Sequence, residues 1–253
     1  MYFARGGVLT PTGEVELREE QGWHLARVLR ARPGESIRVV VDGTQELLVE
    51  LSEVSAALVR GRVLDVRPAR GEPRCRLLLV QAIPKGSGMT ELCERTSELG
   101  VTSIWPVFSE RTVPRPGPAA SADRRRRWAK VAGEAAQLAG RSRAPEVEEP
   151  AGLDGALERL RERVPDAQLF VCQREPAAVA LTAAPYDPLR PAAVLIGPEG
   201  GWSPGELGRL RGLGSVTVSL GPRNLRTVVA GVVALTLLLA RAGEFGPPLG
   251  ERA

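Results

Sequence analysis

Two glycine-proline loops near the C-terminus are the best candidates in this chain for holding a ligand. The first is Gly-Pro-Glu-Gly-Gly at 197–201, and the second is Gly-Pro-Arg-Asn-Leu-Arg at 221–226. Each directly follows an apolar run, at 192–196 or 216–220, which predicts a parallel strand buried on both faces. Because open α/β sheets bind ligands at the carboxyl ends of their strands, we expect two adjacent strands to bring both loops to one site.

The chemistry of these loops is that of the main chain. Glycine has no Cβ, so the backbone can approach a ligand closely and offer amide and carbonyl groups. Residues 197–201 match neither the Walker A motif nor the dinucleotide Gly-x-Gly-x-x-Gly fingerprint. A phosphate cradle is therefore disfavoured, and the alternative to a ligand site is a pair of structural turns.

The composition narrows the class of protein. The 253 residues carry a formal net charge of +4, which permits an acidic partner without requiring one. Cys75, Cys93 and Cys172 are odd in number and widely spaced, so they predict no zinc site and no disulfide framework. Reduced thiols, and an N-terminus without a secretory signal, favour a cytoplasmic protein.

Residues 1–72 predict a small β domain. A helix is expected at 21–30, with Leu25, Val28 and Leu29 on one face. The strands are expected in the Val- and Leu-rich runs 37–41, 47–51 and 57–66, which turn signals separate.

From residue 73 to residue 253, strands alternate with helices, which predicts an α/β domain with a parallel sheet and crossover connections. A capping box with proline at the first helical position, at 203–206, ends the first glycine loop. A helix at 122–139, capped by Ser121, is expected to bury Trp128, Val131, Ala132, Ala135 and Leu138. The expected strands are Leu77–Ile83, Ser103–Val107, Gln168–Cys172, Ala192–Ile196 and Val216–Leu220.

The last predicted helix, 228–240, contains Thr236 as its one polar residue. It is shorter than the roughly 20 apolar residues of a membrane span. A helix that is apolar on all sides is expected to be buried all round, so it lies under the sheet, packs against a second chain, or does both.

Several stretches carry a resemblance to a known family. The two longest are Leu-Ile-Gly-Pro-Glu-Gly-Gly-Trp-Ser-Pro-Gly-Glu at 195–206 and Ser-Leu-Gly-Pro-Arg-Asn-Leu-Arg-Thr at 219–227. Shorter matches occur at 24–30, 98–101, 109–111, 134–136 and 140–141. Together these stretches resemble the RsmE family of ribosomal RNA methyltransferases, within the SPOUT superfamily.

The resemblance implies a PUA-like RNA-binding barrel in residues 1–72 and a SPOUT methyltransferase domain, tied in a trefoil knot, in residues 73–253. It implies a homodimer, formed largely through the helix 228–240, that needs no metal or membrane. Such an enzyme takes a methyl group from S-adenosylmethionine and places it on N3 of a uridine in 16S rRNA of the small ribosomal subunit. The implied cofactor-binding residues are Leu195, Gly197, Gly200, Leu220, Leu225 and Arg226.

Methylation at N3 requires loss of the proton on that nitrogen, so the site needs a base, or a cation that stabilises the anion. Arg226 and Arg223 are candidates for the cation, and Glu199 and Glu98 for the carboxylate; we expect Arg226 and Glu199 to be the catalytic residues. The structural alternatives are a salt bridge for Arg226 and a carboxylate held by backbone donors for Glu199.

RNA contact is expected from basic side chains in both domains. The four arginines at 124–127 lie at a helix start, where positive charge opposes the helix dipole; they contact phosphate or form a solvated face. Trp23 and Trp202 stack on a base or pack in the protein. The expected RNA-binding residues are His24, Arg27, Arg30, Arg124, Arg141 and Arg223.

Val228 and Leu138 stand where the family usually has glutamate and glutamine. These departures leave two other hypotheses open. One is the same fold methylating a different RNA position, and the other is an RNA-binding or assembly protein without turnover.

Overall fold

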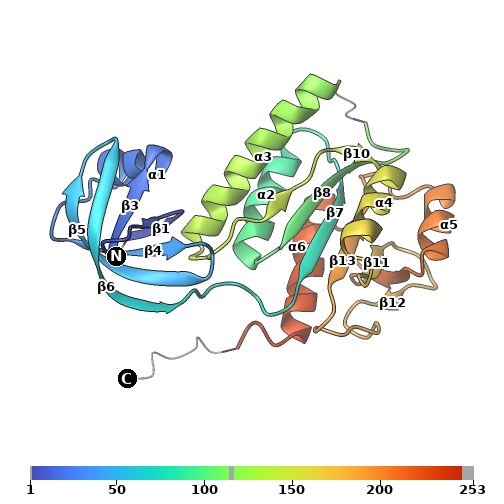
Figure 1. Cartoon of the computed structure of the whole chain (residues 1–253). Helices are drawn as coiled ribbons and strands as arrows, with labels where there is room; N and C mark the ends of the chain where they lie inside the picture. Colours follow the sequence, from blue (N-terminus) through green and yellow to red (C-terminus); the bar gives the residue numbers. More distant parts are fainter. Residues whose placement is uncertain (1, 114–116, 247–253) are drawn as a thin grey trace. The chain divides into compact units, whose positions relative to one another are not determined.

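The computed structural model describes residues 2–113 and 117–246, and the chain forms two compact units (Figure 1). The first unit contains the residues up to 72 together with 136–144, and the second contains the rest. The short segment 136–144, which the sequence pattern assigns to the second domain, therefore packs with the first unit.

The first unit is a six-stranded sheet that curls around its own core (Figure 1). Its strand order is β1-β4-β5-β6-β3-β2, with β1 parallel to β4 and the other pairs antiparallel. Side chains alternate between core and solvent along β3 and β5, as expected for a sheet with one solvated face. The strands are β1 (Tyr2–Arg5), β2 (Val8–Leu9), β3 (Glu14–Arg18), β4 (Ser36–Val41), β5 (Gln45–Val54) and β6 (Leu58–Pro68).

The helix predicted at 21–30 is instead a short α1 (Glu19–Trp23) followed by a π-helical turn, η1 (His24–Val28). In this wider turn, the amide of Leu29 donates to the carbonyl oxygen of His24, five residues earlier. The wider turn changes which side chains face inward: Leu25 is buried, whereas Val28 is 51% exposed. The prediction that Val28 lies on the buried face is therefore wrong.

One carboxylate, that of Glu72, fastens the segment 136–144 within the first unit. Arg141 Nη2 lies 2.7 Å from Glu72 Oε2, and the amide nitrogen of Arg143 lies 2.9 Å from Glu72 Oε1. A Cβ on Gly71 would lie 2.4 Å from the carbonyl oxygen of Gly140, so the two backbones approach too closely for a side chain there. The ion pair and this close approach hold the segment in place.

The second unit is an eight-stranded, wholly parallel sheet. The order is β10-β8-β7-β13-β11-β14-β12, with β9 beside β8. Every residue of β7 and β13 is buried, which explains why both sequences are apolar apart from Gln81 in β7. The strands are β7 (Leu77–Ala82), β8 (Ser103–Phe108), β9 (Glu146–Val147), β10 (Ala151–Gly152), β11 (Gln168–Cys172), β12 (Val179–Ala180), β13 (Ala192–Ile196) and β14 (Val216–Ser219).

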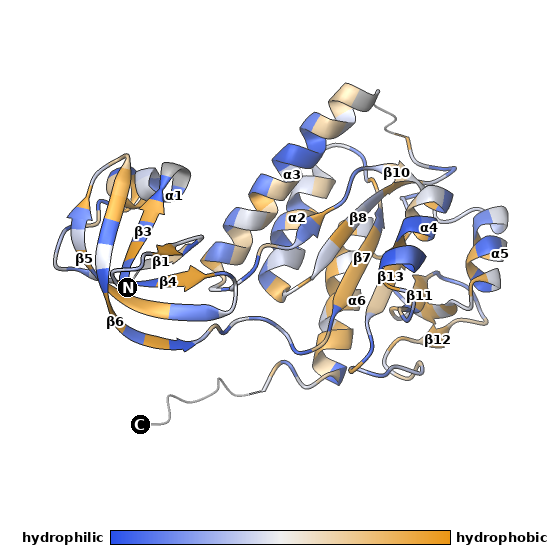
Figure 2. Ribbon diagram, viewed as in Figure 1, coloured by the Kyte–Doolittle hydropathy of each residue, from blue (hydrophilic) through white to orange (hydrophobic). Residues whose placement is uncertain are grey.

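Helices cover both faces of this sheet (Figure 1). Helices α2 (Gly88–Leu99), α3 (Pro118–Leu138) and α6 (Thr227–Arg241) cover one face, and α4 (Leu153–Arg163) and α5 (Pro204–Gly212) cover the other. Apolar colour runs through the central strands and α6 in Figure 2, whereas α4 and α5 carry polar residues. The sheet is thus the buried middle layer of three.

Three details of the helices differ from the predictions. Helix α3 begins at Pro118, so Ser121 lies within its first turn and is not its cap. Leu138, predicted to be buried, is 85% exposed because it lies in the last turn. Helix α6 is not buried all round within the single chain, where Val229 is 43% exposed, so the sheet alone does not cover it. No helix within residues 2–113 and 117–246 is long and apolar enough to cross a membrane.

Candidate active site

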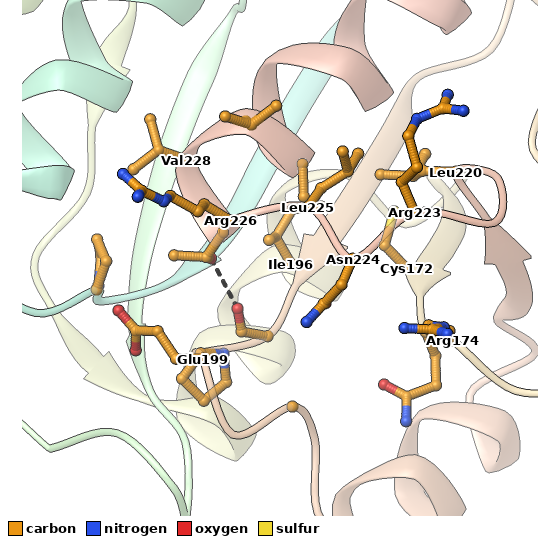
Figure 3. Close-up of a pocket in the computed structure, with 18 of the residues that line it drawn as sticks. Cys172, Arg174, Ile196, Glu199, Leu220, Arg223, Asn224, Leu225, Arg226 and Val228 are labelled. Carbon is orange, nitrogen blue, oxygen red and sulfur yellow. Dashed lines mark hydrogen bonds between the residues drawn. The ribbon is translucent and has the colours of Figure 1, made fainter.

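A cavity of about 640 Å³ lies at the carboxyl ends of β11, β13 and β14 (Figure 3). Both glycine-proline loops line it, the first through Gly197 to Glu199 and the second through Arg223 to Arg226. We expected the strands that carry the two loops to be adjacent. They are not, because β11 lies between β13 and β14. The loops nevertheless meet, since all three strands are parallel and end at the same edge.

The last residue of β11 and the two residues after it form a third wall of the cavity that the glycine motifs do not predict. Cys172, Gln173 and Arg174 line the cavity beside the two loops. They follow a predicted strand, so the rule that selected the glycine loops also applies to them. The fourth side comes from the turn between β7 and α2, where Lys85 and Gly88 lie.

The first glycine loop is fixed in place from several directions. Arg111 Nη1 donates to the carbonyl oxygen of Gly200 at 2.7 Å, and the amide of Lys85 donates to Glu199 Oε1 at 3.1 Å. After the loop, the predicted capping box of Ser203 and Glu206 is confirmed. The buried Glu206 also accepts a hydrogen bond from the amide of Glu110. The loop therefore needs little ordering when a ligand binds.

A buried hydrogen-bond chain joins the first loop to the start of α6. Gln81 Nε2 donates to Thr227 Oγ1 at 2.8 Å, and Thr227 Oγ1 donates to the carbonyl oxygen of Gly197 at 2.8 Å. Thr227 is the first residue of α6 and directly follows the second loop. Through its hydrogen bond to Thr227, Gln81 therefore helps to fix the position of the two loops relative to each other.

The six expected cofactor-binding residues divide into two groups. Gly197, Leu220, Leu225 and Arg226 line the cavity, together with apolar neighbours from β13 and β14. Leu195 and Gly200 are not among the described residues that line it. Leu195 is fully buried in the core, and Gly200 faces Arg111.

Charged side chains lie on two sides of the cavity. Figure 3 places Arg226 and Glu199 on one side, and Arg174 and Arg223 on the other, with Asn224 between them. Arg226 forms no ion pair with any residue in the described ranges, which weakens the salt-bridge alternative for this side chain. Burial raises the pKa of the Cys172 thiol to about 12, so this side chain adds no charge to its wall of the cavity at neutral pH.

The expected RNA-binding residues lie in separate places. His24, Arg27 and Arg30 surround the π-helical turn of the first unit, where Arg27 and Arg30 are exposed. Trp23, just before the turn, is 52% exposed, whereas Trp202 is buried.

In the second unit, Arg124 is partly exposed on α3 and Arg223 is exposed at the cavity. The prediction that Arg141 contacts RNA is corrected, because its side chain is 3% exposed and paired with Glu72. It holds the first unit together and is not available to RNA.

A parallel sheet whose glycine loops enclose a cavity at its carboxyl edge, together with a small β unit, defines a class of RNA methyltransferases. Residues 71–239 match a family model described as an RNA methyltransferase domain, and residues 17–61 match an RNA methyltransferase PUA domain. The chain belongs to the RsmE family, ribosomal RNA small subunit methyltransferase E.

Named relatives cover most of the chain. It is 32% identical to ribosomal RNA small subunit methyltransferase E of Mycobacterium tuberculosis over 90% of this chain and 87% of that protein. It is 30% identical to the protein of the same name in Synechocystis, over 89% of this chain and 73% of the relative. A crystal structure of the Neisseria gonorrhoeae methyltransferase E bound to S-adenosyl methionine matches 97% of this chain and 100% of that one, with a TM-score of 0.85 and 27% identity.

Proposed function

We propose that this protein transfers the methyl group of S-adenosylmethionine to N3 of a uridine in 16S rRNA. The observation that carries the proposal is the meeting of both glycine loops at one cavity, in a chain of the RsmE family. The similar Neisseria gonorrhoeae enzyme binds S-adenosyl methionine, which supports the same cofactor here.

The residues around the cavity fit this cofactor. Ile196, Leu220 and Leu225 offer apolar surface for an adenine ring, and the glycine loops offer main-chain edges for its polar atoms. S-adenosylmethionine has no phosphate, which agrees with the absence of a Walker A motif from the sequence. When bound, it supplies an activated methyl group. The protonated thiol of Cys172 is a poor nucleophile, so it does not compete for that methyl group.

We assign the chemical step to Arg226 and Glu199. The exposed guanidinium of Arg226 stabilises the negative charge that spreads onto O2 and O4 when uridine N3 loses its proton. Glu199, on the same side of the cavity in Figure 3, accepts that proton or orients the base. Its Oε1 already accepts the Lys85 amide at 3.1 Å, which leaves Oε2 for the substrate.

RNA contact is assigned to residues of both domains, 1–72 and 73–253. Arg27 and Arg30 offer cations, and His24 an imidazole that can hydrogen-bond, beside the exposed indole of Trp23, a combination suited to phosphate and to a stacked base. Arg124 and Arg223 are the proposed RNA contacts of the methyltransferase domain, and Arg223 lies at the cavity.

We also propose a cytoplasmic homodimer with a trefoil knot at the cofactor site. The outer face of α6 supports the dimer, because Val229 is exposed and Val232 and Val233 are incompletely buried in the single chain. Light scattering at micromolar concentration tests it. We expect the wild type to be a dimer and Val233→Glu to dissociate it. A monomeric wild type would refute the proposed assembly.

The central experiment uses methyl-labelled S-adenosylmethionine and rRNA from a strain that lacks its own uridine methylation, followed by nucleoside mass spectrometry. The expected product is 3-methyluridine. A different methylated nucleoside would retain the enzyme and change its target. Binding of cofactor and RNA without transfer would favour an assembly protein, and reversion of Val228 to glutamate would then be the next test.

A further inference from the structure

We infer that Gln81 is a positioning residue for the cofactor site, although its side chain does not line the cavity. The inference rests on the proposed S-adenosylmethionine site. Gln81 lies in β7 and is fully buried. It acts on the site through Thr227, which lies between Gln81 and Gly197.

The hydrogen bonds in this chain have a fixed direction. An amide nitrogen can only donate, and Gln81 Nε2 gives one hydrogen to the carbonyl oxygen of Ala82 and the other to Thr227 Oγ1, both at 2.8 Å. Because Thr227 Oγ1 accepts from Gln81, its own single hydrogen is left for the carbonyl oxygen of Gly197, 2.8 Å away. The amide of Gln81 thus orients the hydroxyl of Thr227, and the hydroxyl orients the first peptide of the glycine loop.

Gln81 is a costly residue for its position. Its Oε1 is buried without a hydrogen-bond partner among the described residues, a state that is unfavourable for folding. The neighbouring helix leaves room for the amide, since a Cβ on Gly231 would lie 3.3 Å from Gln81 Oε1 and 2.8 Å from Leu92 Cδ1. An apolar side chain in this buried strand would avoid the cost, so folding alone does not explain a glutamine here.

The contribution of Gln81 is to the geometry of the main chain that lines the cavity. Gly197 lines the cavity, and its hydrogen bond with Thr227 joins the first loop to α6, the helix that follows the second loop. Because the carbonyl group of Gly197 points towards Thr227 at the start of α6, the other main-chain amide and carbonyl groups of the loop are directed to the cofactor before it binds. A loop organised in advance loses less conformational freedom on binding, which appears as higher affinity.

The test combines Gln81→Met, which keeps the volume and removes the donor, with Thr227→Val and the double variant. Calorimetry gives the Kd for S-adenosylmethionine. We expect each single variant to weaken binding about tenfold, and the double variant to bind about as weakly as Thr227→Val alone, because both changes break one chain. Thr227→Ser keeps the hydroxyl and is expected to retain the affinity of the wild type.

Two further readouts separate positioning from a structural role. Gln81→Met is expected to melt at the same temperature as the wild type or higher without cofactor, and to raise the KM for S-adenosylmethionine while leaving kcat and the KM for RNA unchanged. Thr96→Val is the matched control: it removes a buried hydroxyl that bonds to Leu92 within α2, outside the cavity. Its affinity for the cofactor is expected to equal that of the wild type.

Wild-type affinity in Gln81→Met would overturn the inference, as would additive losses in the double variant or an equal loss in Thr96→Val. In each of these outcomes the wild type still binds S-adenosylmethionine, so the proposed function stands. If the wild type itself does not bind the cofactor, the proposed function fails and the role of Gln81 fails with it.

Discussion

The guanidinium of Arg111 holds the carbonyl oxygen of Gly200 at 2.7 Å, and so anchors the first glycine loop from outside the cavity. Arg111 does not line the cavity among the described residues. A side chain that touches no ligand thus helps to determine the shape of the site.

Loss of this anchor is expected to weaken cofactor binding. In Arg111→Ala, the loop gains freedom that S-adenosylmethionine must remove on binding, so the Kd is expected to rise about five- to tenfold. Arg95→Ala is the control, because Arg95 pairs only with Glu98 on the surface of α2 in the described structure. An Arg111→Ala variant with wild-type affinity would show that the other hydrogen bonds of the loop hold it without Arg111.

The second glycine loop depends on a left-handed residue. Gly221 has φ 102°, and a Cβ there would meet no atom within 4 Å, so Gly221→Ala introduces backbone strain of about 1–2 kcal/mol without a clash. Gly214 has φ 79° and equally open space but lies outside the cavity. Both alanine variants are expected to lose similar stability in urea titrations, and only Gly221→Ala to lose cofactor affinity. Equal affinities in the two variants would contradict this assignment.

Arg226 is expected to contribute to the rate of methyl transfer more than to binding. Arg226→Ala removes the cation beside the developing anion, which lowers the single-turnover rate about a hundredfold, while Arg226→Lys retains part of it. Arg223→Ala, across the cavity, is expected to weaken RNA binding and to leave the single-turnover rate nearly intact. Transfer at the full rate by Arg226→Ala would remove this residue from the mechanism.

The ion pair of Glu72 and Arg141 is expected to stabilise the first unit. Glu72→Gln leaves the buried guanidinium without its carboxylate, so unfolding in urea should show a loss of about 2–3 kcal/mol. Glu50→Gln breaks an exposed pair with Arg62 and should cost less than about 0.5 kcal/mol. If the two variants are equally stable, the buried pair is not a major support.

Alkaline pH is expected to destabilise the protein through its buried thiols. Burial raises the pKa of Cys93 from 9.0 to about 12, so between these values the folded state retains a proton that the unfolded state has lost. The free energy of unfolding therefore falls as the pH rises from 9 towards 12, by up to about 1.4 kcal/mol per pH unit for this group. Cys93→Ala starts less stable but lacks this loss, so its deficit relative to the wild type should shrink between pH 9 and 11. A constant deficit would contradict the raised pKa.

The accuracy of the sequence predictions follows how local each feature is. The limits of β11 and β13 were predicted to the residue, because a strand with a centre buried on both faces appears in the sequence as a short apolar run. The order of β13, β11 and β14 could not be predicted, since the periodicity of a strand does not specify its neighbours.

The same reasoning applies to single residues. The capping box of Ser203 and Glu206 was visible because its members are three positions apart. The burial of Arg141 depends on Glu72, 69 positions earlier, and no local pattern reports that pairing. Cys172 to Arg174 were missed for another reason: the search favoured glycine, although the strand before them carried the same signal.

The discontinuity of the first unit has a consequence for biosynthesis. A ribosome makes residues 1–72 well before 136–144. The nascent first unit therefore lacks its last segment while residues 73–135 of the second unit are translated. Truncation after residue 72 would yield a fragment that has lost Arg141, and with it the partner of Glu72. Isolation of the N-terminal unit therefore requires a fusion that supplies 136–144 through a linker, because a simple cut at the sequence boundary leaves the unit incomplete.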